Sequence, residues 1–598
     1  MWYTVRLISA GEGTFAVYLK KTPTKGGRVS LSAVQGYRDE TGRNRQRTIK
    51  TFGFVDELAK TYDDPVAHFR QVVAEMDAER LRTEAPATIA IHPRQRLDRR
   101  EPGQLRRHAG DALACWWLDA LGVEAAVRNA MRARRCEYDV NAVLHLLVCE
   151  RLLEPGSKLA AWENKGRHFF RTQFSEDDVY RSLSELDRLS GRLVDACNRA
   201  IAKHAPRDES LVYYDVTNYF FECDPDAEGL RKKGVGKEHR PSPIVQMGML
   251  QDSEGIPIAF DLFEGDVNDC ETLLPVLRRG ERRGLGRVVV VADKGMNCSD
   301  NIAGCVAGGD GFVFSQSLRG TKSDSACKAW ALSDGGYAAS ADGEFKIKSS
   351  QRTKKIHLKG ADTFDGHKKD VDVEVKVVAM WSRKYAERAR HEREKVLEKS
   401  RQLVERPGAY TRATHYGAAQ YVKGITFDRK TGEVVEQTGV KPEIDQEAME
   451  AAAALDGYCL IITSETGWDQ GRVLDAYRGL WRIEESFKVT KTGGLCSRPV
   501  FVWTPEHIRA HFLTCYLALL IVRHSQRALP SHPGAKALLE EMRALDCSFA
   551  EDGWWLFDHR SDLTDEIFAL VGEEAPRKWM RTSDIKALFA KGKTIRWR

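Results

Sequence analysis

Residues 211–222 read LVYYDVTNYFFE, an apolar and aromatic run that is typical of a β-strand. Two more strand-like runs follow at 244–251 (IVQMGMLQ) and 256–264 (IPIAFDLFE). A helical pattern over 269–284 then precedes RVVVVAD (287–293), which indicates a buried strand. The order β-β-β-α-β predicts a three-stranded meander followed by a crossover helix, unlike a strictly alternating doubly wound sheet.

This α/β core is predicted in two parts, 206–317 and 456–526. The first part ends with a strand at 311–317, and the second begins with the strand-like DGYCLIITSE and contains two helices. Residues 318–455 alternate short charged strands with a highly charged helix, which indicates a β-rich insertion. Residues 527–598 form a C-terminal region with a basic end.

The chain before the core divides into three predicted segments. Residues 29–52 alternate apolar and polar side chains around an Asp39–Gly42 turn, which predicts an arginine-rich β-hairpin in a basic module over 1–60. A helix and an Arg-rich, proline-containing linker are predicted over 61–108. Residues 109–205 are predicted to be a helical, DNA-binding domain, although no helix-turn-helix or zinc-finger signature is legible.

Composition limits the classes of protein that the chain can be. The 598 residues are 42% hydrophobic and 30% charged with a net charge of +6, so nucleic-acid binding would depend on local basic stretches. The longest apolar run, around 512–522, is too short to span a bilayer, and we expect a cytoplasmic protein without a membrane partner. The 13 scattered cysteines indicate reduced thiols.

Two aspartates stand at unusual places in the predicted strands. Asp215 lies inside a strongly β-forming run, where an aspartate is locally unfavourable. Asp293 ends the run VVVVA, at the carboxyl end of a strand where α/β proteins commonly place their sites. Taken singly, each is more often a turn cap or an ion-pair partner, so the interpretation depends on a third acid.

The third acid comes from residues 477–494, YRGLWRIEESFKVTKTGG. On one continuous helix, Glu484 shares a face with Tyr477, Lys488 and Lys491. Glu485 points about 100° away, toward Arg478 and Arg482, and is predicted to be their structural partner. Together with Asp215 and Asp293, Glu484 would complete a set of three carboxylates able to hold two Mg²⁺ ions about 3.5–4 Å apart for phosphodiester chemistry.

The segments YYDVTNYFFE, VVADKGMN and YRGLWRIEESFKVTKTGG resemble the catalytic blocks of bacterial insertion-sequence DDE transposases with a ribonuclease-H-like fold. They are most similar to the insertion-sequence-four-like group, whose signature is Y-x2-R-x3-E-x6-K. Tyr477, Glu484 and Lys491 fit it, whereas Leu480 stands in place of the arginine. The resemblance implies that Asp215, Asp293 and Glu484 are metal-binding catalytic residues, and that Tyr477, Lys488 and Lys491 contact DNA phosphates.

Other polar and aromatic residues allow both a functional and a plainer structural interpretation. The basic loop RKKGVGKEHR (231–240), with Lys237 and Arg240, and Lys294 beside Asp293 are predicted DNA contacts, although a solvated turn remains an alternative for the loop. His507 and His511 are predicted to pack rather than bind metal, and the charged helix at 383–405 to be a solvated face. Trp481 could stack on a displaced base, but burial is favoured.

The sequence thus predicts a DDE transposase that binds the terminal inverted repeats of its element, cleaves DNA at the ends and joins the 3′-hydroxyl to target DNA. The resemblance implies two Mg²⁺ ions, with Mn²⁺ able to substitute, a homodimer on paired double-stranded ends, and a nucleoid-associated location. Two alternatives stay open: a ribonuclease-H-like nuclease that does not join strands, and an inactive DNA-binding protein derived from a transposase.

Overall fold

The computed structural model describes most of the chain. The described residues are 16–24, 27–38, 44–83, 106–226, 228–234, 242–281, 286–319, 324–358, 369–406, 417–424, 426–427, 434–435, 441–550 and 553–597. The chain divides into two compact units, Met1–Arg99 with Ala550–Gly553, and Arg100–Phe549 with Trp554–Arg598.

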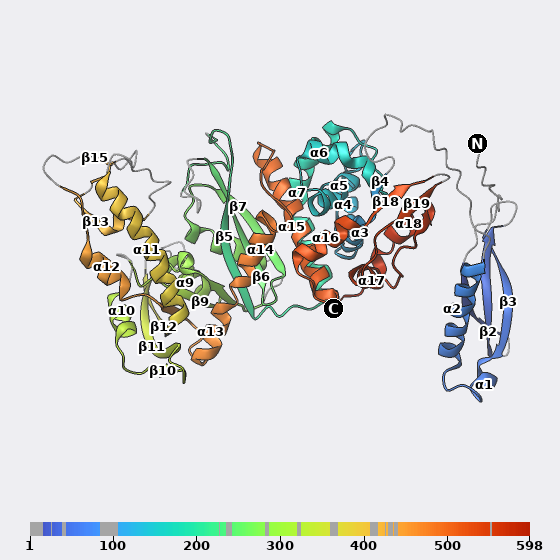
Figure 1. The fold of residues 1–598 in the computed structure, drawn as a ribbon, viewed down its shortest axis with the longest axis horizontal. Helices are drawn as coiled ribbons and strands as arrows, with labels where there is room; N and C mark the ends of the chain where they lie inside the picture. The colour runs from blue at the N-terminus through green and yellow to red at the C-terminus, as the bar shows by residue number, and fades with distance from the viewer. Residues whose placement is uncertain are drawn as a thin grey trace. The chain divides into compact units, whose positions relative to one another are not determined.

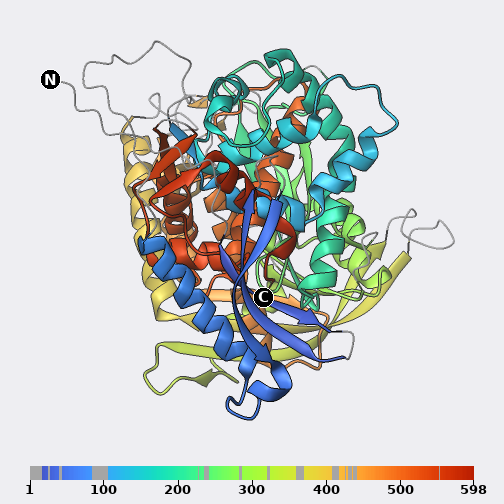
Figure 2. The ribbon, with the colours of Figure 1, turned by 90° about the vertical axis from the view of Figure 1, so that its right-hand side faces the viewer.

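The first unit is a three-stranded antiparallel sheet with a helix packed on it (Figures 1 and 2). Its elements are β1 (Val17–Pro23), β2 (Val29–Arg38), β3 (Asn44–Phe54), α1 (Val55–Leu58) and α2 (Pro65–Thr83). The hairpin expected over 29–52 corresponds to β2 and β3, and β1 adds a third strand that was not predicted. Val73 of α2 packs with Val17 and Ala33 of the sheet, so this small core explains why helix and strands form one unit.

A nine-stranded mixed sheet forms the centre of the second unit, in the order β10-β11-β12-β17-β9-β8-β5-β6-β7 (Figure 1). In that order the strands are Ala338–Ala339, Phe345–Leu358, Lys369–Ser382, Tyr458–Thr463, Gly311–Gln316, Val289–Ala292, Leu211–Phe220, Ile244–Asp252 and Pro257–Glu264. β5, β6 and β7 form the predicted antiparallel meander, β8 lies parallel to β5, and β9 lies parallel to β8. The mixed α/β class is confirmed, and this half of the sheet is consistent with a ribonuclease-H-like core.

The region predicted as a β-rich insertion continues this central sheet. β11 and β12 form a long antiparallel hairpin, β12 pairs with β17, and β17 pairs with β9 of the core. The other elements of the region are α10 (Ser325–Leu332), α11 (Arg383–Glu405), α12 (Gln446–Ala453) and two small sheets, β13 (Val422–Lys423) with β16 (Glu443–Ile444) and β14 (Thr426–Phe427) with β15 (Val434–Val435). Hydrogen bonding thus runs without interruption from the insertion hairpin to the core strands.

Helices pack on both faces of the sheet and on one another. They include α3 (Asp111–Ala120), α4 (Val123–Met131), α5 (Val140–Leu153), α6 (Lys158–Glu163), α7 (Glu176–His204), α8 (Leu273–Glu281), α9 (Ser299–Ala307) and α15 (Pro505–Ala528). α8 packs on β6 and β7 and α9 on β9 and β11, and both belong to a core cluster separate from that of α7 and α15. The apolar helix expected over 507–526 is α15, which is buried throughout 510–525 and packs on α5, α7 and β7. His511 is buried there between Lys158 Nζ, 2.6 Å from its Nδ1, and the Ser497 carbonyl, so its predicted packing role is confirmed.

The C-terminal region forms a four-stranded sheet that includes part of the predicted linker. β18 (Asp546–Phe549) pairs with β4 (Arg106–His108) and with β19 (Trp554–Phe557), and β20 (Trp579–Arg581) forms the far edge. The helices α16 (Ala535–Ala544), α17 (Asp562–Ala569) and α18 (Thr582–Phe589) accompany it. The end of the predicted linker is therefore a strand, because its backbone pairs with β18, which lies far away in sequence. Residues 91–105 of the predicted linker lie outside the described residues.

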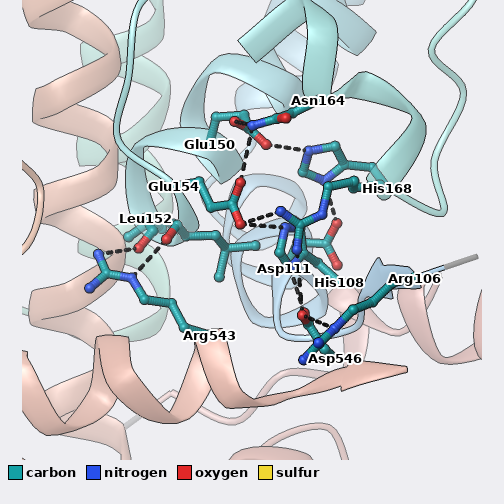
Figure 3. Close-up of polar contacts among 12 residues, drawn as sticks. Arg106, His108, Asp111, Glu150, Leu152, Glu154, Asn164, His168, Arg543 and Asp546 are labelled. Carbon is teal, nitrogen blue, oxygen red and sulfur yellow. Dashed lines mark hydrogen bonds and ion pairs between the residues drawn. The ribbon is translucent and has the colours of Figure 1, made fainter. Parts of the chain in front are cut away.

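A buried network of charged groups joins β4, β18, α3 and α5 (Figure 3). His168 lies between two carboxylates, 2.8 Å from Asp111 and 2.9 Å from Glu150, while His108 lies 2.6 Å from Asp546. Burial alone would lower the pKa of His168, but its hydrogen bonds with Asp111 and Glu150 raise that pKa to about 9. The imidazolium therefore stabilises two acids that would otherwise be buried without a counter-charge.

Two predictions about the whole chain can be compared with the structure. None of the 13 cysteines, all of which lie in the described residues, forms a disulfide. Among the helices of the described residues, none combines the length and the apolar character that a membrane crossing requires.

Candidate active site

Asp215 and Asp293 are neighbours in the central sheet. Asp215 lies in β5, and Asp293 follows β8 directly, before a short 3-10 helix, η3 (Lys294–Met296). The two strands run parallel with Tyr214 opposite Ala292, so the aspartates are the next residues on each strand. Because paired strands lie about 4.8 Å apart, the sheet brings together two acids that are distant in sequence.

The stretch that carries Glu484 is two helices and not the single helix that we expected. α13 (Gln470–Arg478) contains Tyr477, and α14 (Trp481–Lys491) contains Glu484. Between them, Gly479 packs so closely on β5 that a Cβ at this position would lie 1.9 Å from the Tyr213 hydroxyl oxygen. The predicted single helix over this stretch is therefore wrong: it is interrupted at Gly479 and Leu480, where the chain packs on the sheet.

One cavity nevertheless collects all three predicted acids. Its volume is about 870 Å³, and it is lined by Asp215, Asp293 and Glu484 together with Tyr477 and Lys294. Among the described residues, the Glu484 side chain has neither a hydrogen bond nor an ion pair, so its carboxylate faces the cavity unpaired. Asp215 within β5, Asp293 at the end of β8 and Glu484 in the first turn of α14 thus line one cavity, although they are distant in sequence.

Asp293 is held by two hydroxyl groups. Ser315 Oγ donates a hydrogen bond of 3.0 Å to Asp293 Oδ1, and Tyr477 Oη donates one of 3.3 Å to the same oxygen. Burial, more than any other influence, raises the pKa of Tyr477 above its ordinary value, so the phenol keeps its proton for this bond. Sequence reasoning missed Ser315, although its place follows from the pairing of Ala292 with Phe314 one residue earlier on β8 and β9.

The two adjacent glutamates differ in their surroundings, as predicted, but the partner of Glu485 is not the predicted one. Glu485 lies 2.8 Å from Arg523 of α15, not beside Arg478 or Arg482. The same guanidinium also donates to Ser486 Oγ at 2.7 Å. The error arose because helical phase alone cannot show which neighbouring helix covers a face, and here that helix is α15.

The predicted DNA-contacting lysines are not all at the cavity. Lys294 lines it, whereas Lys488 and Lys491 do not. Lys488 is exposed on α14, and Lys491 Nζ lies 5.1 Å from the centre of the Tyr219 ring. Lys237 and Arg240 lie outside the described residues.

The lining of this cavity also includes residues that we expected elsewhere. Trp481 is 56% exposed and lines the cavity, so its predicted burial is wrong: α14 begins at this residue and points it away from the sheet. Helix α11 was predicted to be a solvated face, yet its Tyr385 and Arg388 also line the cavity. Arg319 and Arg478 add further positive charge to the lining.

The donor atoms suit a hard divalent cation. All three acids supply carboxylate oxygens, which Mg²⁺ prefers, and Asp293 Oδ2 is left over after Oδ1 has accepted its two hydrogen bonds. Within the described ranges, no group of three or more Asp, Glu, His or Cys side chains is arranged to hold one ion. Mg²⁺ commonly takes only one or two carboxylates besides water and substrate phosphate, so a pair of ions sharing Asp215 remains compatible with these residues.

Two family models match the chain. One, described as "IS1634 family transposase, N-terminal domain", matches residues 19–87, and the other, described as "Transposase DDE domain", matches residues 223–521, half of the chain. The chain therefore belongs to the DDE transposases, the enzymes that move DNA elements. Together the two matches identify it as a transposase of the insertion-sequence type. Among the curated proteins, the search found no match.

The matched ranges relate to the structure in a simple way. The N-terminal match begins within β1 and includes β2, β3, α1 and all of helix α2 of the first unit. The DDE match includes Asp293 and Glu484 but begins after Asp215, although Asp215 lies beside Asp293 in the sheet and lines the same cavity. The link between Asp215 and the other acids therefore rests on the geometry of the fold.

Proposed function

We propose that this transposase cleaves DNA at the ends of its insertion sequence and joins the freed 3′-hydroxyl to target DNA. The observation that carries the proposal is the single cavity lined by Asp215, Asp293 and Glu484. In this proposal the three acids hold two Mg²⁺ ions, for which Mn²⁺ could substitute, with Asp215 shared between them. When bound, such ions activate the attacking oxygen and stabilise the leaving oxygen of a phosphodiester.

The remaining residues of the cavity position the acids and the DNA. Ser315 and Tyr477 orient the Asp293 carboxylate through their hydrogen bonds to Oδ1. Lys294, Arg319 and Arg478 are proposed to bind backbone phosphates, which aligns the reacting bond without reading its sequence. Lys488, Lys491, Lys237 and Arg240 remain proposed contacts with DNA beyond the cavity.

Recognition of the terminal inverted repeats is proposed for the parts of the chain outside the central nine-stranded sheet. Exposed Arg45, Arg47 and Lys50 on β3 of the first unit give that unit a basic strand. Work on paired ends would require at least a homodimer on DNA. Membership of the insertion-sequence-four-like group also remains a proposal, since Leu480 is a buried residue where that signature has arginine.

A strand-transfer assay tests the proposal. The full chain is incubated with Mg²⁺ and a duplex that carries either an intact or a pre-cut element end, and the products are sized on a denaturing gel. We expect cleavage of the intact end and joining of the pre-cut end, both absent in Asp293→Asn. Cleavage without any joined product would favour the nuclease alternative, and binding without cleavage would favour the inactive DNA-binding protein.

A further inference from the structure

A second cavity lies in the helical part of the chain, on elements that do not contribute to the candidate active site. Its volume is about 470 Å³, and it lies between the end of α4, the loop that follows, the start of α5 and the segment around Phe170. Four arginines line it: Arg128, Arg132, Arg134 and Arg171. We refer to it as the arginine cavity.

Charge in the arginine cavity is strongly unbalanced. Two acids line it, Glu124 and Asp139, and both already have partners. Glu124 lies 3.1 Å from His145 and 3.5 Å from Arg128, while Asp139 caps α5 by accepting hydrogen bonds from the N–H groups of Asn141 and Ala142. The acids therefore do not neutralise the other arginines.

A buried histidine also lines the arginine cavity. His145 lines the cavity with its Nδ1 3.7 Å from Cys115 Sγ. Burial would lower the pKa of His145, but hydrogen bonds with Cys115 and Glu124 raise it to about 10. Hydrogen bonds with Cys149 and His145 lower the pKa of Cys115 to about 7, so the imidazolium is held between the Glu124 carboxylate and the Cys115 sulfur, and the net positive charge of the cavity comes from its arginines.

Two arginines remain available to a ligand. Arg134 is paired with Glu185 of α7, whereas the side chains of Arg132 and Arg171 have no ion pair or hydrogen bond within the part of the chain that the structure describes. Both are exposed and lie on different segments, so their guanidinium groups can approach one anion from two sides. Guanidinium groups bind phosphate oxygens through paired, charge-assisted hydrogen bonds.

Resting on the proposed transposase function, we propose that the arginine cavity binds backbone phosphates of the element DNA, away from the phosphodiester that reacts. The cavity is lined by side chains of α4 and α5, while the three acids come from β5, the end of β8 and α14. A DNA duplex is favoured over a free nucleotide because the arginines are exposed. Contacts of this kind position a duplex and do not discriminate between sequences.

The test compares DNA binding by the unaltered full chain with that of Arg132→Ala/Arg171→Ala. Fluorescence anisotropy measures Kd for an element-end duplex and for a random duplex over a range of salt concentrations, without divalent metal. We expect Kd to rise about tenfold or more for both duplexes, and the slope of log K against log salt to become shallower by about 1.8, the value for two lost phosphate contacts.

Matched variants separate this effect from misfolding and from general loss of charge. Arg192, exposed on α7 outside the arginine cavity, serves as the control, and Arg192→Ala should change Kd less than twofold and leave the slope unaltered. Arg132→Lys/Arg171→Lys should keep most of the slope. An unchanged slope in the double alanine variant overturns the proposal. Loss of DNA binding in millimolar ATP at constant ionic strength also overturns it, because it would indicate a nucleotide site.

The outcome is distinguishable from failure of the proposed function. If the unaltered chain joins pre-cut ends and the double alanine variant binds DNA as tightly as it does, the arginine cavity is not a DNA site. If the double variant loses affinity but the unaltered chain never joins ends, the arginine cavity binds DNA and the transposase proposal fails.

Discussion

The Tyr477 hydroxyl donates its hydrogen bond to the Asp293 carboxylate, linking helix α13 to the end of strand β8. Ser315 donates to the same oxygen from β9, so two elements fix the rotation of one acid. The resemblance to known transposases instead implied a phosphate contact for this tyrosine. The two roles lead to different results when the hydroxyl is removed.

Tyr477→Phe should raise the Mg²⁺ concentration needed for half-maximal cleavage, by about tenfold if the loss resembles that of other residues that orient a metal ligand. Ser315→Ala should act in the same direction, because it removes a donor to the same oxygen. The measurement is a Mg²⁺ titration of end cleavage at saturating DNA. An unchanged Mg²⁺ requirement with weaker DNA binding would assign Tyr477 to the phosphate instead.

Glu484→Gln and Glu485→Gln should separate the two adjacent acids. Loss of a carboxylate that holds catalytic metal removes several kcal/mol of transition-state stabilisation, so Glu484→Gln should slow cleavage by about 10³-fold while DNA binding persists. Glu485→Gln weakens the ion pair with Arg523, which should cost about 1 kcal/mol of stability because the glutamate is partly exposed. Cleavage rates and urea unfolding measure both; a severe cleavage defect only in Glu485→Gln would reverse the assignment.

Gly479→Ala should destabilise the junction between α13 and α14. The added Cβ would meet the Tyr213 hydroxyl oxygen at 1.9 Å, so the helices or the strand must shift, at a cost of about 1–3 kcal/mol. Gly467 offers a matched control, since a Cβ there would meet nothing within 4 Å. Thermal unfolding of Gly467→Ala should stay close to that of the unaltered chain, and equal effects of the two substitutions would contradict the packing argument.

The stability that His168 provides should depend on pH in a defined window. Its pKa is about 9 in the folded chain and about 6.5 when unfolded, so its contribution is full below pH 6.5 and is lost as the pH rises through 9. The shift corresponds to about 3 kcal/mol. The difference in unfolding free energy between the unaltered chain and His168→Gln should therefore shrink from pH 6 to pH 10.

A control is needed because other buried groups titrate in the same range. Lys158, whose pKa burial lowers to about 7, changes stability in the opposite direction. Comparing the unaltered chain with His168→Gln at each pH removes that background. His391, exposed on α11, gives a matched substitution that removes no buried contact, and the unfolding free energy of His391→Gln should stay within about 0.5 kcal/mol of that of the unaltered chain. A pH-independent difference for His168→Gln would show that its charge does not stabilise the network.

Local pattern predicted the strands of the core well, because short, continuous, β-branched runs such as VVVVA are typical of buried strands. The parallel pairing of β5 with β8 then explains why the order of the strands in the sequence was enough to predict that Asp215 and Asp293 lie close together. Helical phase could not predict the break at Gly479, since it says nothing of the β5 side chain that packs against this glycine. The predictions of the Glu485 partner and of Trp481 burial were wrong for the same reason. Each depends on whether a helix distant in sequence packs on that face, which local sequence does not show.

The hairpin β11–β12 has a consequence for anyone who wishes to shorten the protein. Because β17 is flanked by β12 on one side and β9 on the other, removal of the region between the two halves of the core would strip a row of backbone N–H and C=O groups of their partners. An uncovered row of this kind recruits strands from other molecules. A trimmed enzyme would thus be prone to aggregate even if its three acids kept their places.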